Sequence, residues 1–73
     1  MGLTAFNYWM TAAREDLESL PLYTAKAPRA DILRRAIACL RFALGAANTL
    51  RDQPRRNLCL RALTMLRAAL ARL

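Results

Sequence analysis

Apolar residues recur every three to four positions along three stretches of the chain, which is the spacing of one face of an α-helix. The first stretch covers about residues 3–19, and its apolar face consists of Leu3, Phe6, Met10, Ala13 and Leu17. Polar side chains fill the opposite arc. We expect Pro21 to stop this helix and residues 20–28 to form a connector, because a proline disfavours helix in the residue before it.

A second stretch, about residues 29–52, carries one long apolar stripe. We expect its helix to begin at Pro28 or Arg29, because proline is tolerated in a first turn and Asp31 complements the helix dipole there. The stripe consists of Ile32, Leu33, Ala36, Ile37, Leu40, Ala43, Leu44, Ala47 and Leu50. Its centre is alanine, so we expect a neighbouring helix to approach towards the lower end of the ~8–10 Å range of interaxial distances.

A third stretch, about residues 55–73, follows a turn at Asp52, Gln53 and Pro54. Its apolar seam repeats at alternating spacings of four and three, as in a helix packed along a partner, and consists of Cys59, Leu63, Leu66, Leu70 and Leu73. The seam is widened to an arc of about 160°, broad enough to contact two neighbours, by Leu58, Ala62, Met65 and Ala69. The short turn predicts that the second and third helices pack antiparallel.

These patterns predict one all-α domain, either a small three-helix bundle or a helical hairpin with an N-terminal docking helix. The composition agrees, because the 73 residues include 15 Ala, 14 Leu and 11 Arg but no Val and only two Ile. Helix formers therefore dominate, and the β-branched aliphatic residues that favour strands are nearly missing. The length allows a single domain, and the aliphatic content is too high for a disordered chain.

The sequence offers little catalytic or metal-binding chemistry. It contains no His, Ser19 is its only serine, and Gly2 and Gly45 are its only glycines, so no Gly-rich phosphate loop is present. A zinc site needs about four ligands, which Cys39 and Cys59 cannot supply. We expect both cysteines to be buried, reduced thiols. The prediction is a protein that is not an enzyme, with no catalytic residue, no cofactor and no metal.

One carboxylate cluster stands out, at Glu15, Asp16 and Glu18. Glu15 and Glu18 have the spacing of an acid–base pair on one helix face, although a solvated face is the more ordinary interpretation. Acids near a helix C-terminus oppose the helix dipole. We therefore expect Arg34, Arg35 or residues of another chain to offset them.

Charge is unevenly distributed along the chain. The formal net charge is +7, and all of it falls in residues 31–73, where nine Arg face Asp31 and Asp52. Selection for contacts with carboxylate or phosphate groups explains such an excess of Arg over Lys. A GC-rich genome that favours Arg, Ala and Leu codons explains it equally well, and the sequence leaves both explanations open.

Nucleic-acid binding is the main alternative function, because Arg side chains of the second and third helices would gain affinity for phosphates by releasing counterions. Against it, the basic region holds no aromatic residue for base stacking except Phe42, and no helix-turn-helix is recognisable.

Membrane binding is less well supported. The third helix has Arg on its polar side, as interfacial helices do, but its apolar arc lacks Trp and Phe. No apolar run approaches the ~20 residues that span a bilayer. Because no targeting signal is visible either, we expect a cytoplasmic protein.

Protein binding is the function that we favour. A domain of this size buries only about 60 % of its unfolded surface, so a protein partner, or a second copy in a homodimer, would add burial that the core lacks. Phe42 and Leu60 fall outside the stripes of their helices, in arcs occupied by Arg. If the packing brings them together, they form an apolar anchor for an acidic partner, with a basic rim of Arg34, Arg35, Arg41 and Arg61.

Tyr8, Trp9 and Tyr23 form an alternative anchor, and we expect Trp9 mostly in the core and Tyr8 outside it. No run of residues resembles a known family. The size and composition are those of small adaptors, of inhibitors or other regulators, and of co-chaperones, which is an analogy of class and not a motif match.

Overall fold

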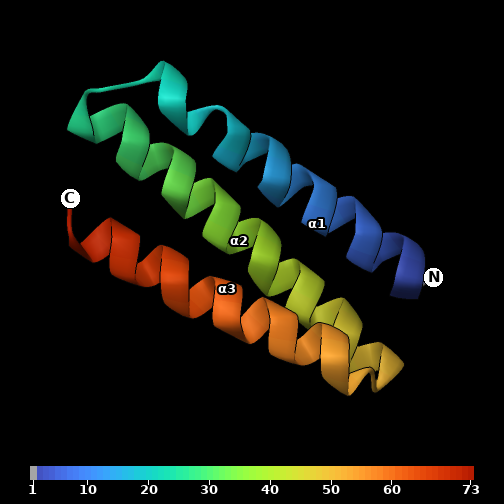
Figure 1. Cartoon of the computed structure of the whole chain (residues 1–73). Coiled ribbons are helices and arrows are strands. Elements are labelled where there is room, and N and C mark those ends of the chain that lie inside the picture. The colour runs from blue at the N-terminus through green and yellow to red at the C-terminus, as the bar shows by residue number, and fades with distance from the viewer. Residues whose placement is uncertain (1) are drawn as a thin grey trace.

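Three α-helices lie side by side in the computed structural model of the chain, which describes residues 2–73 (Figure 1). The helices are α1 (Gly2–Glu18), α2 (Lys26–Leu50) and α3 (Gln53–Ala71), and a 3-10 turn, η1 (Leu20–Leu22), follows α1. Successive helices run in opposite directions with α2 in the middle, so α1 and α3 are parallel to each other (Figure 1). The predicted all-α, three-helix architecture is confirmed.

The connector between α1 and α2 is tied down by one arginine. The Arg29 guanidinium donates hydrogen bonds to the carbonyl oxygens of Leu20 at 3.0 Å and Tyr23 at 2.8 Å. α2 begins at Lys26, ahead of the predicted start at Pro28 or Arg29. The earlier start is possible because Pro28 then lies in the first turn, where its missing N–H leaves no helical hydrogen bond unmade.

The connection between α2 and α3 is shorter, with only Arg51 and Asp52 between the helices. Arg51 adopts the left-handed conformation with φ 55°, which ends α2. The Asp52 carboxylate then caps α3 by accepting a hydrogen bond from the backbone N–H of Arg55 at 3.1 Å, and it also pairs with the Arg55 guanidinium. This cap places Gln53 and Pro54 inside the helix, although the sequence predicted them in the turn.

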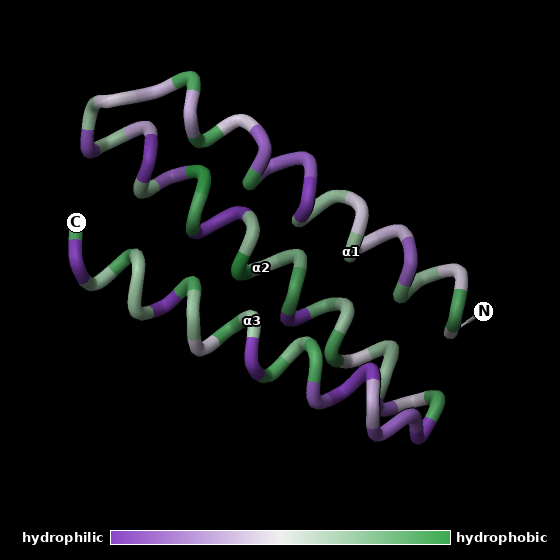
Figure 2. The backbone as a smooth tube through the Cα atoms, viewed as in Figure 1, coloured by the Kyte–Doolittle hydropathy of each residue, from purple (hydrophilic) through white to green (hydrophobic). Residues whose placement is uncertain are grey.

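The core follows the inner face of α2, whose predicted central alanines, Ala36, Ala43 and Ala47, are all fully buried. Two buried clusters draw on all three helices. One contains Phe6, Ala43, Ala47 and Cys59, and the other contains Ala13, Leu40 and Leu63. Figure 2 shows how hydrophobic segments recur between hydrophilic ones along each helix, as the periodicity predicted.

Both α1 and α3 pack along α2, but they do not form a comparable pair with each other within residues 2–73. The molecule is correspondingly flattened, with Cα extents of 38 × 19 × 13 Å. The broad apolar arc of α3 is therefore covered on one side only. On its other side Leu58 stays 47 % exposed and Met65 70 % exposed.

Candidate protein-binding surfaces

An apolar groove lies between α1 and α3, with α2 beneath it. Three helices supply its lining residues, which are Met10, Ala13, Arg14 and Leu17 of α1, Leu40 of α2, and Ala62, Met65 and Leu66 of α3. We call it the α1–α3 groove. Seven of its eight lining residues are apolar, and the most exposed of these seven is Met65.

The sequence builds this groove from two helix faces that lack a partner. Met10 and Leu17 are seven residues apart and so lie on the same side of α1. Met65 lies three residues after Ala62 on α3, again on one side. These residues belong to the apolar stripes of their helices; Met10 and Ala62 are partly buried against the core, whereas Met65 is exposed. Methionine is flexible and polarisable, so Met10 and Met65 can adapt to the shape of an incoming surface.

Basic side chains accompany the groove. Arg14 lines it directly, and Arg61 lies on the same edge of α3 as Leu58 and Met65, three residues after the first and four before the second. Two ion pairs form among residues 2–73, Asp31–Arg34 and Asp52–Arg55, and neither includes Arg14 or Arg61. The guanidinium groups beside the groove therefore face no carboxylate of this chain within ion-pair distance.

Of the two apolar residues of the predicted anchor, Phe42 contacts α1. Phe42 is 60 % exposed, and its ring stacks on Trp9 of α1 with ring centroids 4.6 Å apart. Leu44 packs instead against the cluster that holds Leu63 of α3. Two residues turn a helix by about 200°, so Phe42 points away from the α3 side of α2. Leu60, on α3, is 37 % exposed.

The four arginines predicted to rim that anchor are Arg34, Arg35, Arg41 and Arg61, and all are exposed. Their role as the rim of an apolar anchor stays a prediction. Arg34 pairs with Asp31 at 3.3 Å, and both side chains are largely exposed. An exposed pair of this kind contributes little to stability.

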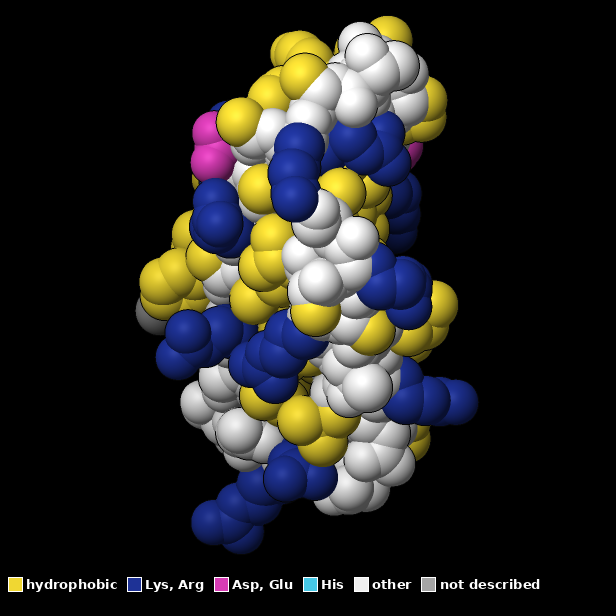
Figure 3. All heavy atoms as spheres, turned by 90° about the vertical axis from the view of Figure 1, so that its left-hand side faces the viewer, with side chains coloured by type: hydrophobic (Ala, Val, Ile, Leu, Met, Phe, Trp, Pro, Cys, Tyr) yellow, Lys and Arg dark blue, Asp and Glu magenta, His cyan; other side chains and the backbone are white. Residues whose placement is uncertain are grey.

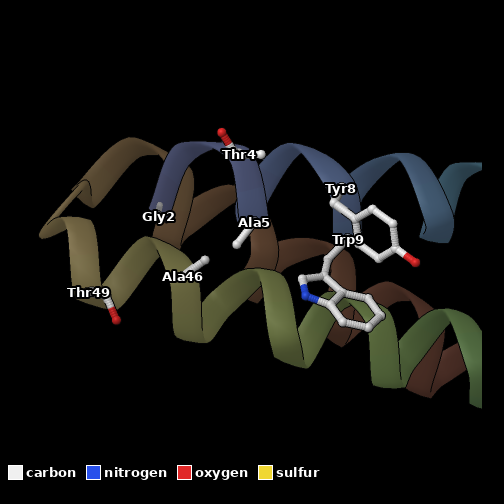
Figure 4. A pocket seen from close by; sticks show the side chains of 7 residues that line it. All are labelled: Gly2, Thr4, Ala5, Tyr8, Trp9, Ala46 and Thr49. Atoms are coloured by element: carbon white, nitrogen blue, oxygen red, sulfur yellow. The ribbon is translucent and has the colours of Figure 1, made fainter.

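An aromatic cluster occupies the opposite side of the α1–α2 pair. The Tyr8 ring meets Trp9 edge-on with centroids 4.9 Å apart, and Trp9 in turn stacks on Phe42. Next to it is a shallow cleft, drawn in Figure 4, which is lined by Gly2, Thr4, Ala5, Tyr8, Trp9, Ala46 and Thr49. None of these residues is charged, so this cleft differs in character from the α1–α3 groove.

The alternative aromatic anchor is only partly assembled. Tyr8 is 64 % exposed, as expected, but Trp9 is half-buried at the edge of the core and not inside it. The Trp9 ring packs against the cluster around Phe6 on one side and stacks on the exposed Phe42 on the other. Tyr23 lies in the connector, outside the cluster.

The carboxylate cluster has no arginine partner in the structure. Within residues 2–73, Glu15 and Glu18 form no ion pair, so neither Arg34 nor Arg35 offsets them as an ion-pair partner. Asp16 accepts a weak hydrogen bond from the Cys39 thiol, with sulfur and oxygen 3.9 Å apart. An offset by another chain stays a prediction.

Both cysteines are free thiols, and Cys59 is fully buried. Burial raises the pKa of the Cys59 thiol above its ordinary value. Burial also raises the pKa of Cys39, with a further contribution from the negative charge of Asp16. Both sulfurs are therefore kept in the protonated, poorly nucleophilic form. No three metal-binding side chains gather anywhere in residues 2–73.

Positive charge is spread widely over the surface. In Figure 3, Lys and Arg side chains are scattered over the whole visible face, with hydrophobic and other groups between them. They do not form one continuous basic stripe on this face, which is the arrangement expected for tracking a phosphate backbone. In the described chain, no helix is both long and apolar enough to cross a membrane.

Comparison with protein-family models, with curated proteins and with solved structures gives no match for this chain.

Proposed function

We propose that this chain is a small, non-enzymatic cytoplasmic protein that binds an acidic protein partner at the α1–α3 groove, as an adaptor, a regulator or inhibitor, or a co-chaperone. The observation that carries the proposal is the apolar groove itself, with Leu40 among its lining residues and Met65 left 70 % exposed. A contiguous apolar hollow with polar edges is typical of a protein-interaction site. The groove takes the place of the Phe42–Leu60 anchor as the proposed binding surface.

The total exposed surface of the chain is somewhat larger than that of an average monomer of its mass. A folded monomer of this mass, 8.2 kDa, typically exposes about 4500 Å², whereas the chain exposes 5071 Å². Because the excess is of the size that one side of a modest interface buries, a partner seated in the groove would bring the exposed surface close to that of an ordinary domain.

The charge balance supports an acidic partner. The net charge is +7, and Arg14 and Arg61 beside the groove have no ion-pair partner in the described chain. Arginine forms bidentate pairs with carboxylates, which gives an interface both orientation and specificity. An acidic partner would also be steered to the basic molecule at long range.

Site-specific crosslinking in the native host tests this function. A photo-reactive residue replaces Met65 in the groove or, as a control, Leu22 in η1, which is 79 % exposed. We expect one protein adduct from position 65 and none from position 22. That protein, once purified, should bind the chain with one-to-one stoichiometry and lose affinity for the Met65→Glu variant.

Equal adducts from both positions would overturn the proposal. Adducts with nucleic acid, together with absorbance at 260 nm that leaves the purified protein in high salt, would favour the competing function, in which Arg side chains of α2 and α3 bind phosphates.

A further inference from the structure

The α1–α3 groove runs between two parallel helices. Its two walls, α1 and α3, are parallel, and both run antiparallel to the α2 helix between them (Figure 1). From Met10 to Leu17 the groove side of α1 extends over about 10 Å, which matches two turns of a bound helix. We propose that the segment of the partner that binds here is an amphipathic α-helix with acidic flanks, which completes a four-helix arrangement. This inference rests on the proposed function.

Backbone chemistry favours a helix over an extended segment. The groove is walled by helices, whose own N–H and C=O groups are already paired along the helix axis. An extended segment placed between them would find no backbone partners, and burying its peptide groups would cost free energy. A helix satisfies its backbone internally and presents only side chains, as in other helix-in-groove complexes.

The apolar lining fixes the pattern that the incoming helix needs. Met10 and Leu17 on one wall, Leu66 on the other, and Leu40 beneath form an apolar trough. A helix fills such a trough with residues at i, i+3 or i+4, and i+7, which lie on one of its sides. Leu and Met side chains at those positions would pack against the exposed Met65.

Charge on the groove edges explains the acidic flanks. Arg14 lies on the α1 side, while Arg61, and Arg72 seven residues beyond Met65, continue the α3 edge. The acid that follows Arg14 by four residues is Glu18, so positive charge dominates the two edges together. Glu or Asp next to the apolar positions of the incoming helix would pair with these arginines.

A second copy of this chain is a poor occupant by the same criteria. Each of its helices already uses the centre of its apolar face against the other helices of its own bundle. Two molecules of net charge +7 would also repel each other at close range. The occupant is therefore a different, acidic protein.

Titration of the full chain with synthetic peptides tests the inference. The probe is an acidic amphipathic peptide of about 15 residues, with Leu at the apolar positions and Glu beside them. One control peptide carries Lys in place of each Glu, and another has a central proline that breaks the helix. Calorimetry gives the affinity, and circular dichroism gives the helix content gained on mixing.

We expect the acidic peptide to bind and to become more helical, and both control peptides to bind at least about tenfold more weakly. Met65→Glu in the chain should weaken binding of the acidic peptide by a similar factor, because it places a carboxylate in the apolar trough. Leu22→Glu, at a side chain even more exposed than Met65, should leave the affinity unchanged. Unaltered thermal unfolding of the Met65→Glu chain shows that its fold is intact.

No binding of the acidic peptide, equal binding of the proline-containing peptide, or insensitivity to Met65→Glu would overturn the helix inference. Equal binding of duplex DNA or of vesicles containing anionic lipid, insensitive to Met65→Glu, would overturn it as well. Crosslinking from position 65 to a natural partner is independent of these results. If that crosslink forms while the peptides fail, the proposed function stands and only the helical, acidic partner segment is rejected.

Discussion

The inner face of α2 and the α1–α3 groove differ in the size of the side chains that the chain places there. Ala36, Ala43 and Ala47 on α2 are completely buried, which brings both neighbouring helices close. Met65, with a much longer apolar side chain, is left 70 % exposed. The comparison teaches that the small residues of the central helix are fully covered, whereas the outer edge of α3 beside the groove is not, although α1 and α3 both contribute residues to the two buried clusters.

The largest effect is expected when a large side chain is removed from the buried core. Leu63 is 2 % exposed and belongs to the cluster that joins all three helices. Leu63→Ala should lower the free energy of unfolding by about 2–5 kcal/mol, which is comparable to the ~3–5 kcal/mol that a core of this size supplies. Urea denaturation followed by circular dichroism measures the loss.

Leu60→Ala is the matched control on the same helix, because Leu60 is 37 % exposed. Its cost should stay below about 1 kcal/mol. Similar losses for the two variants would mean that α3 is rotated relative to the packing described above.

Enlarging a small residue tests the close approach directly. Ala43→Leu inserts three carbon atoms where the alanine is fully buried, and overpacking of this kind should cost about 1–3 kcal/mol. Ala38→Leu adds the same atoms at an exposed position of α2 and should change the free energy of unfolding by less than about 0.5 kcal/mol. Thermal unfolding of both variants distinguishes a closed interface from a loose one, since only a loose one would accept the larger side chain at position 43.

A smaller effect on stability is expected at the N-terminus of α3, where Asp52 caps the helix. Hydrogen bonds from the Arg55 backbone N–H and side chain hold the pKa of Asp52 below its ordinary value of 3.8. The carboxylate therefore stabilises the folded state above that value, and this stabilisation is lost as the pH falls from 3.8 through the lower folded-state pKa. Asp52→Asn keeps a capping side chain but should flatten the pH dependence of the melting temperature in this range.

Asp31→Asn is the control for that experiment, because the Asp31 carboxylate is exposed on α2 and forms only an exposed pair with Arg34. The pH dependence should survive in this variant. Its disappearance would show that Asp52 is not the group responsible.

The smallest effect on stability is expected for a substitution in the α1–α3 groove. Met65→Glu should change the free energy of unfolding by less than about 0.5 kcal/mol, because the side chain is mostly in water already. A large loss in chemical denaturation would mean that Met65 supports the fold, and the groove would then belong to the core. A Met65→Glu variant that is stable yet defective in binding would show that the α1–α3 groove serves binding, whereas the buried core serves stability.

The periodicity of the sequence predicted most of the fold. The alanines at the centre of the α2 stripe are the most buried residues of that helix, and Cys59 and Leu63 of the α3 seam are buried as well. The start of α2 was harder to predict, because proline is accepted at several positions of a first turn and Pro28 does not fix which one is used. The capping role of Asp52 likewise moved the start of α3 to Gln53.

The candidate site was less accessible from the sequence because it depends on how the helices are rotated and spaced. Phe42 and Leu60 both lie outside their stripes, but only the three-dimensional packing shows that Phe42 belongs with Trp9. A signal for the groove was nevertheless present. The apolar arc of α3 is broader than the part that the two buried clusters cover, so the surplus at Leu58 and Met65 marks the open side.

The stack of Trp9 on Phe42 gives the molecule a built-in optical reporter. Trp9 is the only tryptophan of the chain, so the intrinsic fluorescence excited at the red edge of the absorption band comes from the contact between α1 and α2 alone. Detachment of α1 from a still-helical α2–α3 hairpin would therefore shift the emission before the overall helix content falls. The emission spectrum of Trp9 therefore reports whether the α1–α2 pair separates before the α2–α3 pair.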